Sequence, residues 1–231
     1  MTVYEVYEAI SKSKNTNSSG KDGISMRILK DTQQFSARVI THMFNTIIFK
    51  KKYPSILKKA KVIPICKPGK PETEISSYRP ISILPTVDKV LQGLMRTQLE
   101  SYFEGNKIIT PEHHGGRQHH STVSALGSID LTNKTFKEKH KTVAIMTTDL
   151  SSAFDLVDYK LLVAKLKYYG VENSAADLLS DFLSNRSMFT QIQGFNSKTI
   201  EMCPSSVIQG SRLMGFYIQS FQLKFLRYPN L

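Results

Sequence analysis

Three aspartates within ten residues are the first candidates for chemistry in this sequence. Asp149 lies near the end of the apolar, β-branched run 143–150, which predicts a buried strand. Asp155 and Asp158 follow in a short turn before a helical pattern. Catalytic acids commonly lie at the end of a buried strand, where a carboxylate can hold a metal ion. An aspartate before a helix also commonly caps that helix, so the spacing alone leaves both roles open.

An excess of basic residues is the second feature that bears on function. Lys and Arg number 31 against 19 Asp and Glu, which gives a net charge of +12. The excess is uneven, because no acid occurs in the forty residues from Thr32 to Pro71, where eight lysines fall. A lysine run is commonly only a solvated face, but so long a stretch without an acid favours a polyanionic partner. Nucleic acid and an anionic membrane surface both fit.

Composition limits the class of protein. A chain of 231 residues with 40% hydrophobic residues is long and apolar enough to fold around a core. Two cysteines, Cys66 and Cys203, cannot form a disulfide framework or a zinc site by themselves, and the first residues lack the pattern of a signal peptide. No apolar stretch approaches the roughly 20 residues that span a bilayer. We therefore expect an intracellular protein, cytoplasmic or nuclear, without a membrane partner.

Histidines are concentrated in one segment of the chain. Four of the six lie in residues 110–122, and such a cluster could indicate a metal site. Their spacing is that of a loop and does not supply the i, i+4 ligand pair of a helix, and neither cysteine is near in sequence. This pattern argues against zinc.

Local patterns predict the elements that must position these residues. In residues 24–49 we expect a helix with a break near Asp31, packed on the core by apolar positions that include Phe35 and Val39. Two hairpins are expected, one from strands at 61–66 and 78–84 and one from strands at 188–193 and 198–203. The other predicted helices cover residues 3–12, from Pro85 to Gly105, from about 122 to 139, after Asp158 and 174–183.

Five blocks of sequence, in order, carry a resemblance to a known family. The most specific is Ser76-Ser-Tyr-Arg-Pro-Ile-Ser-Ile-Leu-Pro-Thr86, which follows Ile63-Pro-Ile-Cys-Lys-Pro-Gly-Lys70. Before them comes Ser18-Ser-Gly-Lys-Asp-Gly-Ile24, and after them come Gly115-Gly-Arg-Gln-His-His-Ser-Thr122 and Asp149-Leu-Ser-Ser-Ala-Phe-Asp-Leu-Val-Asp158. Together they resemble the reverse transcriptase domain of non-LTR (LINE-like) retrotransposons, in which blocks of this wording occur in this order.

The resemblance implies a fold and a division of the chain. It implies an α+β fold, the right-hand polymerase fold, with fingers and an incomplete palm. Residues 1–23 would form an N-terminal helix and linker, residues 24–141 a fingers-like region, and residues 142–231 a partial palm with a degenerate C-terminal tail. The family function is RNA-directed DNA polymerase, acting on an RNA template and an RNA–DNA hybrid with deoxynucleoside triphosphates.

The same resemblance gives the candidate residues their roles. Asp149 would be the catalytic ligand of Mg²⁺, since nucleotide addition uses two such ions held by carboxylates. Arg79 and Lys67 would contact the incoming triphosphate, because a guanidinium fork and an ammonium both suit phosphate.

Other interpretations stay open: Arg79 could pair with Glu72 or Glu74, Phe154 could be core, and Asp155 and Asp158 could be a turn residue and a helix cap. The remaining implied contacts are Phe154 under the sugar, Gln209 and Gly210 at the nucleotide pocket, and Lys58, Lys59, Lys61 and Arg117 on nucleic acid.

Departures from the family pattern bear on activity. The pocket block Ser206-Val-Ile-Gln-Gly-Ser-Arg-Leu-Met-Gly215 lacks the family's first glycine, its proline and a later glycine. The family's Tyr/Phe-Ala-Asp-Asp hairpin, which supplies the other carboxylates, is absent, and no acid follows Glu201. One aspartate cannot hold two Mg²⁺ ions against their hydration. We therefore expect no polymerase activity from this chain alone. The alternatives are a non-catalytic nucleic-acid-binding remnant and a basic globular interaction protein.

Overall fold

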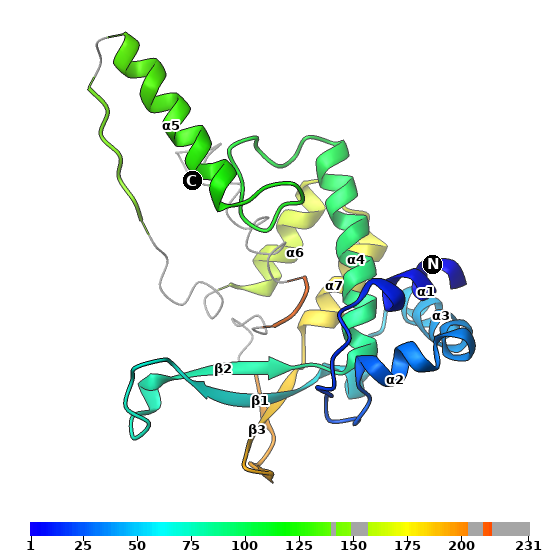
Figure 1. Cartoon of the computed structure of the whole chain (residues 1–231). Coiled ribbons are helices and arrows are strands. Elements are labelled where there is room, and N and C mark those ends of the chain that lie inside the picture. The colour runs from blue at the N-terminus through cyan, green and yellow to red at the C-terminus, as the bar shows by residue number, and fades with distance from the viewer. Residues whose placement is uncertain (140–141, 149–156, 203–209, 214–231) are drawn as a thin grey trace.

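A computed structural model describes residues 1–139, 142–148, 157–202 and 210–213. These residues form helices and a five-stranded sheet, so the fold is of mixed α and β type, as predicted. Figure 1 shows the helices gathered on one side, with the β1–β2 hairpin projecting away from them. No helix in the described ranges has the length and apolar character needed to cross a lipid bilayer.

The chain begins with three helices: α1 (Val3–Lys12), α2 (Met26–Asp31) and α3 (Gln33–Lys50). A capping box between Thr2 and Glu5 starts α1, and the Ser25 hydroxyl accepts a hydrogen bond from Ile28 N to start α2. Thr32 separates α2 from α3, and its hydroxyl donates to the carbonyl of Ile28 at 2.8 Å. The predicted break near Asp31 is therefore confirmed.

The sheet has the order β2-β1-β3-β4, with β5 also paired to β3. β1 and β2 form the predicted antiparallel hairpin, with Ile65 opposite Arg79 and Cys66 opposite Tyr78. β3 pairs with β1 in parallel and with both β4 and β5 antiparallel, so a hairpin is also present where it was predicted, at residues 188–203. The strands are β1 (Lys59–Cys66), β2 (Tyr78–Ile83), β3 (Ser187–Ile192), β4 (Phe195–Asn196) and β5 (Ile200–Glu201), and the short 3₁₀ helices Ser55–Lys58 and Ile75–Ser77 precede β1 and β2.

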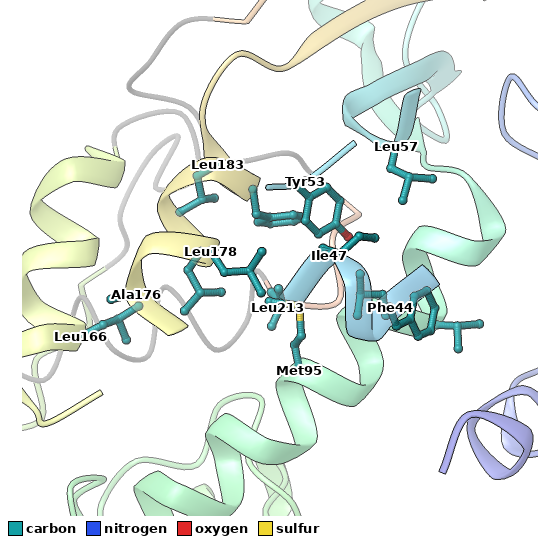
Figure 2. Close-up of a cluster of buried hydrophobic side chains, with 14 of the residues drawn as sticks. Phe44, Ile47, Tyr53, Leu57, Met95, Leu166, Ala176, Leu178, Leu183 and Leu213 are labelled. Atoms are coloured by element: carbon teal, nitrogen blue, oxygen red, sulfur yellow. The ribbon is translucent and has the colours of Figure 1, made fainter. Parts of the chain in front are cut away.

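The main core lies between α1, α3, α4 (Thr86–Gly105), α6 (Tyr159–Tyr168) and α7 (Asn173–Leu183). Figure 2 shows how side chains from α3, α4, α6 and α7 meet in this core. Asp158 caps α6, because its Oδ1 accepts hydrogen bonds from the backbone of Lys160 at 2.7 Å and Leu161 at 3.3 Å. The cap interpretation of this aspartate is confirmed. Side chains with no exposed surface include Phe44, Leu91, Phe103, Leu166 and Leu213.

The segment before Asp149 differs from its prediction. Residues 142–148 form no strand, and Ile145 and Met146 are 61% and 86% exposed. A strand is stabilised by hydrogen bonds to a neighbouring strand. In the described ranges, no strand of the sheet pairs with this segment. Residues 143–146 instead share a cavity with α5 (Thr122–Glu138), a helix that has no buried residue. The prediction of a buried strand is therefore wrong for residues 143–148.

Helix α3 also differs in part from its prediction. Ile40, Phe44 and Ile47 are buried as expected, but Phe35 and Val39 are 81% and 71% exposed. Apolar residues occur on more than one side of this helix, and only one side packs on α1 and the core. The expectation that Phe35 and Val39 face the core is therefore wrong.

Candidate functional site

The tip of the β1–β2 hairpin carries the two residues predicted to bind a triphosphate. Lys67 follows β1 and its ammonium donates a hydrogen bond to the carbonyl of Ser76 at 2.8 Å, which closes the loop. Tyr78 steadies the same loop by donating from its hydroxyl to the carbonyl of Glu72 at 2.9 Å. An ammonium has three donors, so the bond to Ser76 leaves Lys67 with two for another partner.

Arg79 lies on β2 beside this tip and is exposed. No ion pair joins it to Glu72 or Glu74, although all three residues belong to the described part of the chain. The alternative that Arg79 pairs with one of these acids is therefore wrong in this structure. Because the register places Arg79 and Lys67 at the same end of the hairpin, two cations are available there to an anion.

Gly210 lies against the strand that carries Arg79. Its φ is +102°, and a Cβ atom built on it would lie 2.7 Å from the carbonyl oxygen of Ser82 in β2. Only glycine fits a backbone this close in this conformation. The structure thus brings Gly210 against the strand that carries Arg79, at a position three residues along that strand from Arg79. Gln209, the residue before it, lies outside the described residues.

Two residues that sequence reasoning missed, Gln92 and Asp88, hold the segment after Gly210. The Gln92 side-chain oxygen accepts hydrogen bonds from the Ser211 hydroxyl at 2.8 Å and from the backbone of Arg212 at 2.9 Å. Gln92 in turn donates to Asp88 at 2.8 Å, and both side chains are fully buried on α4. A polar pair at i, i+4 inside the apolar stripe of a helix was the available signal.

The Asp88 carboxylate is the centre of this buried network. The Tyr53 hydroxyl donates to it, and a guanidinium nitrogen of Arg186 lies 3.7 Å away. Burial raises the pKa of Asp88 above its ordinary value, although Arg186, Tyr53 and Gln92 pull in the opposite direction. The network links α4, the residue that precedes β3 and the segment after Gly210, so it fixes the glycine turn to the core.

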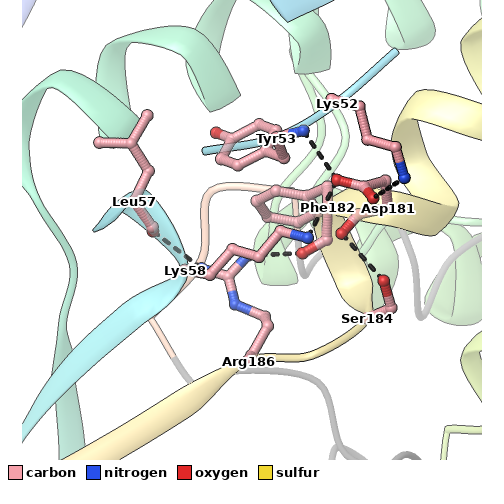
Figure 3. A network of polar contacts seen from close by, with 8 residues as sticks. All are labelled: Lys52, Tyr53, Leu57, Lys58, Asp181, Phe182, Ser184 and Arg186. Carbon is pink, nitrogen blue, oxygen red and sulfur yellow. Dashed lines mark hydrogen bonds and ion pairs between the residues drawn. The ribbon is translucent and has the colours of Figure 1, made fainter. Parts of the chain in front are cut away.

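Lys58 does not have the role that the sequence suggested. Its side chain is buried, and its ammonium forms an ion pair with Asp181 at 2.9 Å. Figure 3 shows Asp181 also accepting from the Tyr53 backbone at 2.7 Å and from Lys52 at 3.2 Å. The assignment of Lys58 to nucleic acid is therefore corrected, because this cation is already neutralised inside the protein.

Arg117 needs the same correction. Its guanidinium forms two hydrogen bonds with the Glu104 carboxylate, at 2.6 and 2.8 Å, and a third with the carbonyl of Thr110 at 3.0 Å. The Arg117 side chain is 14% exposed. The hydrogen bonds from Arg117 also lower the pKa of Glu104. Arg117 therefore holds the histidine-containing loop to the end of α4, and its guanidinium has little capacity left for a phosphate.

Lys59 and Lys61 remain candidates for nucleic acid. They alternate along β1, so they share one face of the sheet, and both are half-buried. The Lys59 ammonium lies 5.7 Å from the centre of the Phe189 ring. Neither lysine takes part in an ion pair among the described residues.

The predicted magnesium ligand lies outside the described residues, as do Phe154 and Asp155. That predicted ligand is Asp149. Within the described ranges, no group of three His, Cys, Asp or Glu side chains has a metal-binding arrangement.

Comparison with known proteins identifies relatives over almost the whole chain. Residues 57–227 match the family model described as reverse transcriptase (RNA-dependent DNA polymerase). A probable RNA-directed DNA polymerase from transposon X-element of Drosophila melanogaster is 33% identical over 90% of this chain, and one from transposon BS of the same species is 30% identical over 99%. The RNA-directed DNA polymerase from mobile element jockey of Drosophila funebris is 27% identical over 92%. This chain spans 23%, 25% and 23% of these relatives' own lengths.

Proposed function

This chain belongs to the reverse transcriptase (RNA-dependent DNA polymerase) family, and we propose that it binds an incoming deoxynucleoside triphosphate and an RNA template. It is a reverse transcriptase domain that resembles those of non-LTR retrotransposons. We further propose that its sheet and helices correspond to the fingers and part of the palm of a right-hand polymerase. The projecting β1–β2 hairpin supports this assignment.

The observation that carries the proposal is the contact between Gly210 and β2. It places the glycine turn beside the strand of Arg79, whose guanidinium is exposed and has no ion pair within the described ranges. Arg79 and Lys67 would hold the triphosphate, because a planar fork and a second cation nearby suit its oxygens. Gly210 would keep the turn against β2, because any side chain at this position would clash with the carbonyl of Ser82.

A metal would supply the chemistry of nucleotide transfer, as in the family generally. The sequence offers Asp149 as one ligand, and one aspartate is too few for two Mg²⁺ ions. We therefore propose that the 231-residue chain binds substrates without extending a primer. A primer-extension assay on an RNA template with Mg²⁺ tests this directly. Extension that Asp149→Asn abolishes would disprove the proposed inactivity.

Nucleotide binding tests the site itself. We expect dTTP to bind the chain in the presence of Mg²⁺. Arg79→Ala should weaken binding by about ten- to hundredfold, since a charge-assisted hydrogen bond contributes about 1.5–3 kcal/mol. Arg27→Ala is the matched control, because Arg27 is equally an exposed arginine and lies on α2. Equal effects of both variants, or no binding by the wild type, would reject the proposed nucleotide site. Isothermal titration calorimetry gives both affinities.

A further inference from the structure

An apolar ridge runs along one side of α3, exposed at Phe35 and Val39 and half-buried at Met43. Phe35, Val39 and Met43 are spaced by four residues, so they follow one another along the same side of the helix. Phe35 is 81% and Val39 71% exposed. Side chains of this size that are scattered need no explanation, but a contiguous row of them marks a surface that binds something.

A cavity of about 380 Å³ adjoins this ridge. Val39 and Met43 form one wall, and Ile24, Ile56 and Val87 come from the preceding loop, the 3₁₀ helix before β1 and the start of α4. Pockets that hold small organic groups have volumes of about 300–1,000 Å³, so one flat ring system fits. The side chains at these positions are aliphatic, and the cavity is open to a flat ring system.

Two lysines, Lys21 and Lys59, line the cavity together. Burial and then the nearby Lys21 lower the pKa of Lys59, so their positive charges are close and incompletely balanced. The acid beside them, Asp22, has a role in its own loop, where its Oδ1 accepts a hydrogen bond from Ile24 N at 3.3 Å. An anion between the two lysines would relieve their repulsion.

The loop that carries Lys21 is held in place by α4. A Cβ atom on Gly20 would lie 2.8 Å from the Cα of Pro85, so the loop packs directly on the start of that helix. The Thr86 hydroxyl also donates to the carbonyl of Ile24 at 2.5 Å. The lysine and the cavity are therefore preformed, which reduces the entropic cost of binding.

We propose that Phe35 and this cavity take unpaired bases of a single-stranded nucleic acid, while Lys21 and Lys59 hold the flanking phosphates. A basic groove with an exposed aromatic platform is how proteins bind single strands. Helix α3 contains no acid that would repel a backbone. The site is separate from the hairpin tip, because Lys59 and Lys67 are eight residues apart along β1, or about 26 Å. The inference rests on the proposed binding of nucleic acid and names where an unpaired segment lies.

A comparison of oligonucleotides with and without bases tests the proposal. We would measure binding of a fluorescent 12-nucleotide RNA and of an abasic ribose-phosphate oligomer of equal length by anisotropy. The wild-type chain should bind the RNA at least fivefold more tightly, since stacking contributes about that much per base. Phe35→Ala should remove most of this difference, and Lys21→Ala with Lys59→Ala should weaken both ligands.

Matched variants distinguish binding at this surface from non-specific electrostatic attraction between RNA and the basic chain. Phe195→Ala removes a phenylalanine of similar exposure, 82%, on the β3–β4 hairpin and should have no effect. Lys137→Ala with Lys160→Ala removes the same charge elsewhere and should weaken binding less than the Lys21 and Lys59 pair. RNA containing 4-thiouridine should crosslink to the peptide that carries Val39 and Met43, a result that needs no variant.

Each other outcome has a defined meaning. RNA binding that is independent of bases, or that Phe35→Ala leaves unchanged, overturns the inference while the proposed function stands. No RNA binding at low salt rejects both. If an acidic helical peptide with leucines at i, i+3, i+4 and i+7 binds in a way that depends on Phe35, and RNA does not, the surface belongs to a protein partner and the inference is wrong.

Discussion

The backbone of Gly210 lies so close to Ser82 that a Cβ atom on the glycine would come within 2.7 Å of the serine carbonyl oxygen. This contact fixes the distance between the glycine turn and the strand of Arg79. The turn is held from its other side by Gln92, which binds Ser211 and Arg212. The glycine turn is therefore held between the hairpin and helix α4.

Gly210→Ala should be more destabilising than alanine at another glycine of positive φ. A non-glycine residue in such a conformation costs about 1–3 kcal/mol, and at Gly210 the clash with Ser82 adds to this. Gly194 is the matched control, because its φ is +86° and nothing lies within 4 Å of a Cβ built there. Urea unfolding of both variants gives the two free energies. Equal losses of unfolding free energy in the two variants would show that the contact with Ser82 does not contribute to stability.

Gln92→Ala should lower the free energy of unfolding by about 2–3 kcal/mol, since leaving a buried polar group without its partner costs about 1–3 kcal/mol. The variant leaves the Ser211 hydroxyl, the Arg212 N–H and Asp88 without this partner. Gln98→Ala on the exposed side of the same helix should change stability by less than about 0.5 kcal/mol. Similar values for the two would mean that the Asp88–Gln92 network does not hold the glycine turn.

How far the sequence predicted this structure depends on the range of the interactions involved. The break at Thr32, the cap at Asp158 and the β1–β2 hairpin follow from residues near one another in sequence, and all were predicted. The strand at 143–148 needed a distant partner to pair with, which no local pattern can guarantee.

Burial of charged residues was the least predictable feature, because it depends on residues far apart in the chain. Lys58 pairs with Asp181, which is 123 residues away, and Arg117 with Glu104, which is 13 away. The basic run from Thr32 to Pro71 therefore mixes lysines without an ion pair in the described ranges, such as Lys61, with neutralised ones such as Lys58. The apolar row on α3 was misassigned for a related reason: periodicity shows that a helix has apolar sides and does not show which side is covered.

Asp158→Ala should lower the free energy of unfolding by about 1 kcal/mol, because its carboxylate satisfies backbone N–H groups at the start of α6. Glu172→Ala is the control, since Glu172 precedes α7 in the same position without a side-chain bond to that backbone. Thermal unfolding followed by circular dichroism gives the comparison. A loss at Glu172 as large as that at Asp158 would contradict the role of Asp158 as a cap.

The stability of the chain should fall in acid partly through Asp181. Burial alone would raise the pKa of this carboxyl, but the Tyr53 N–H, Lys58 and Lys52 outweigh burial and hold the pKa below its ordinary value of 3.8. Because the folded pKa is depressed, the stabilisation is fully present above about pH 4 and is lost as the pH falls through the folded value. Asp181→Asn should therefore cost about 3 kcal/mol at pH 7, where it leaves the buried Lys58 ammonium uncompensated, and much less at pH 2–3.

Asp177→Asn is the control, because Asp177 pairs with Lys51 and Lys167 on the exposed surface and should contribute under about 1 kcal/mol at either pH. Urea unfolding from pH 2.5 to pH 7 measures both. A penalty for Asp181→Asn that does not change with pH would show that the ionised carboxylate is not what holds Lys58.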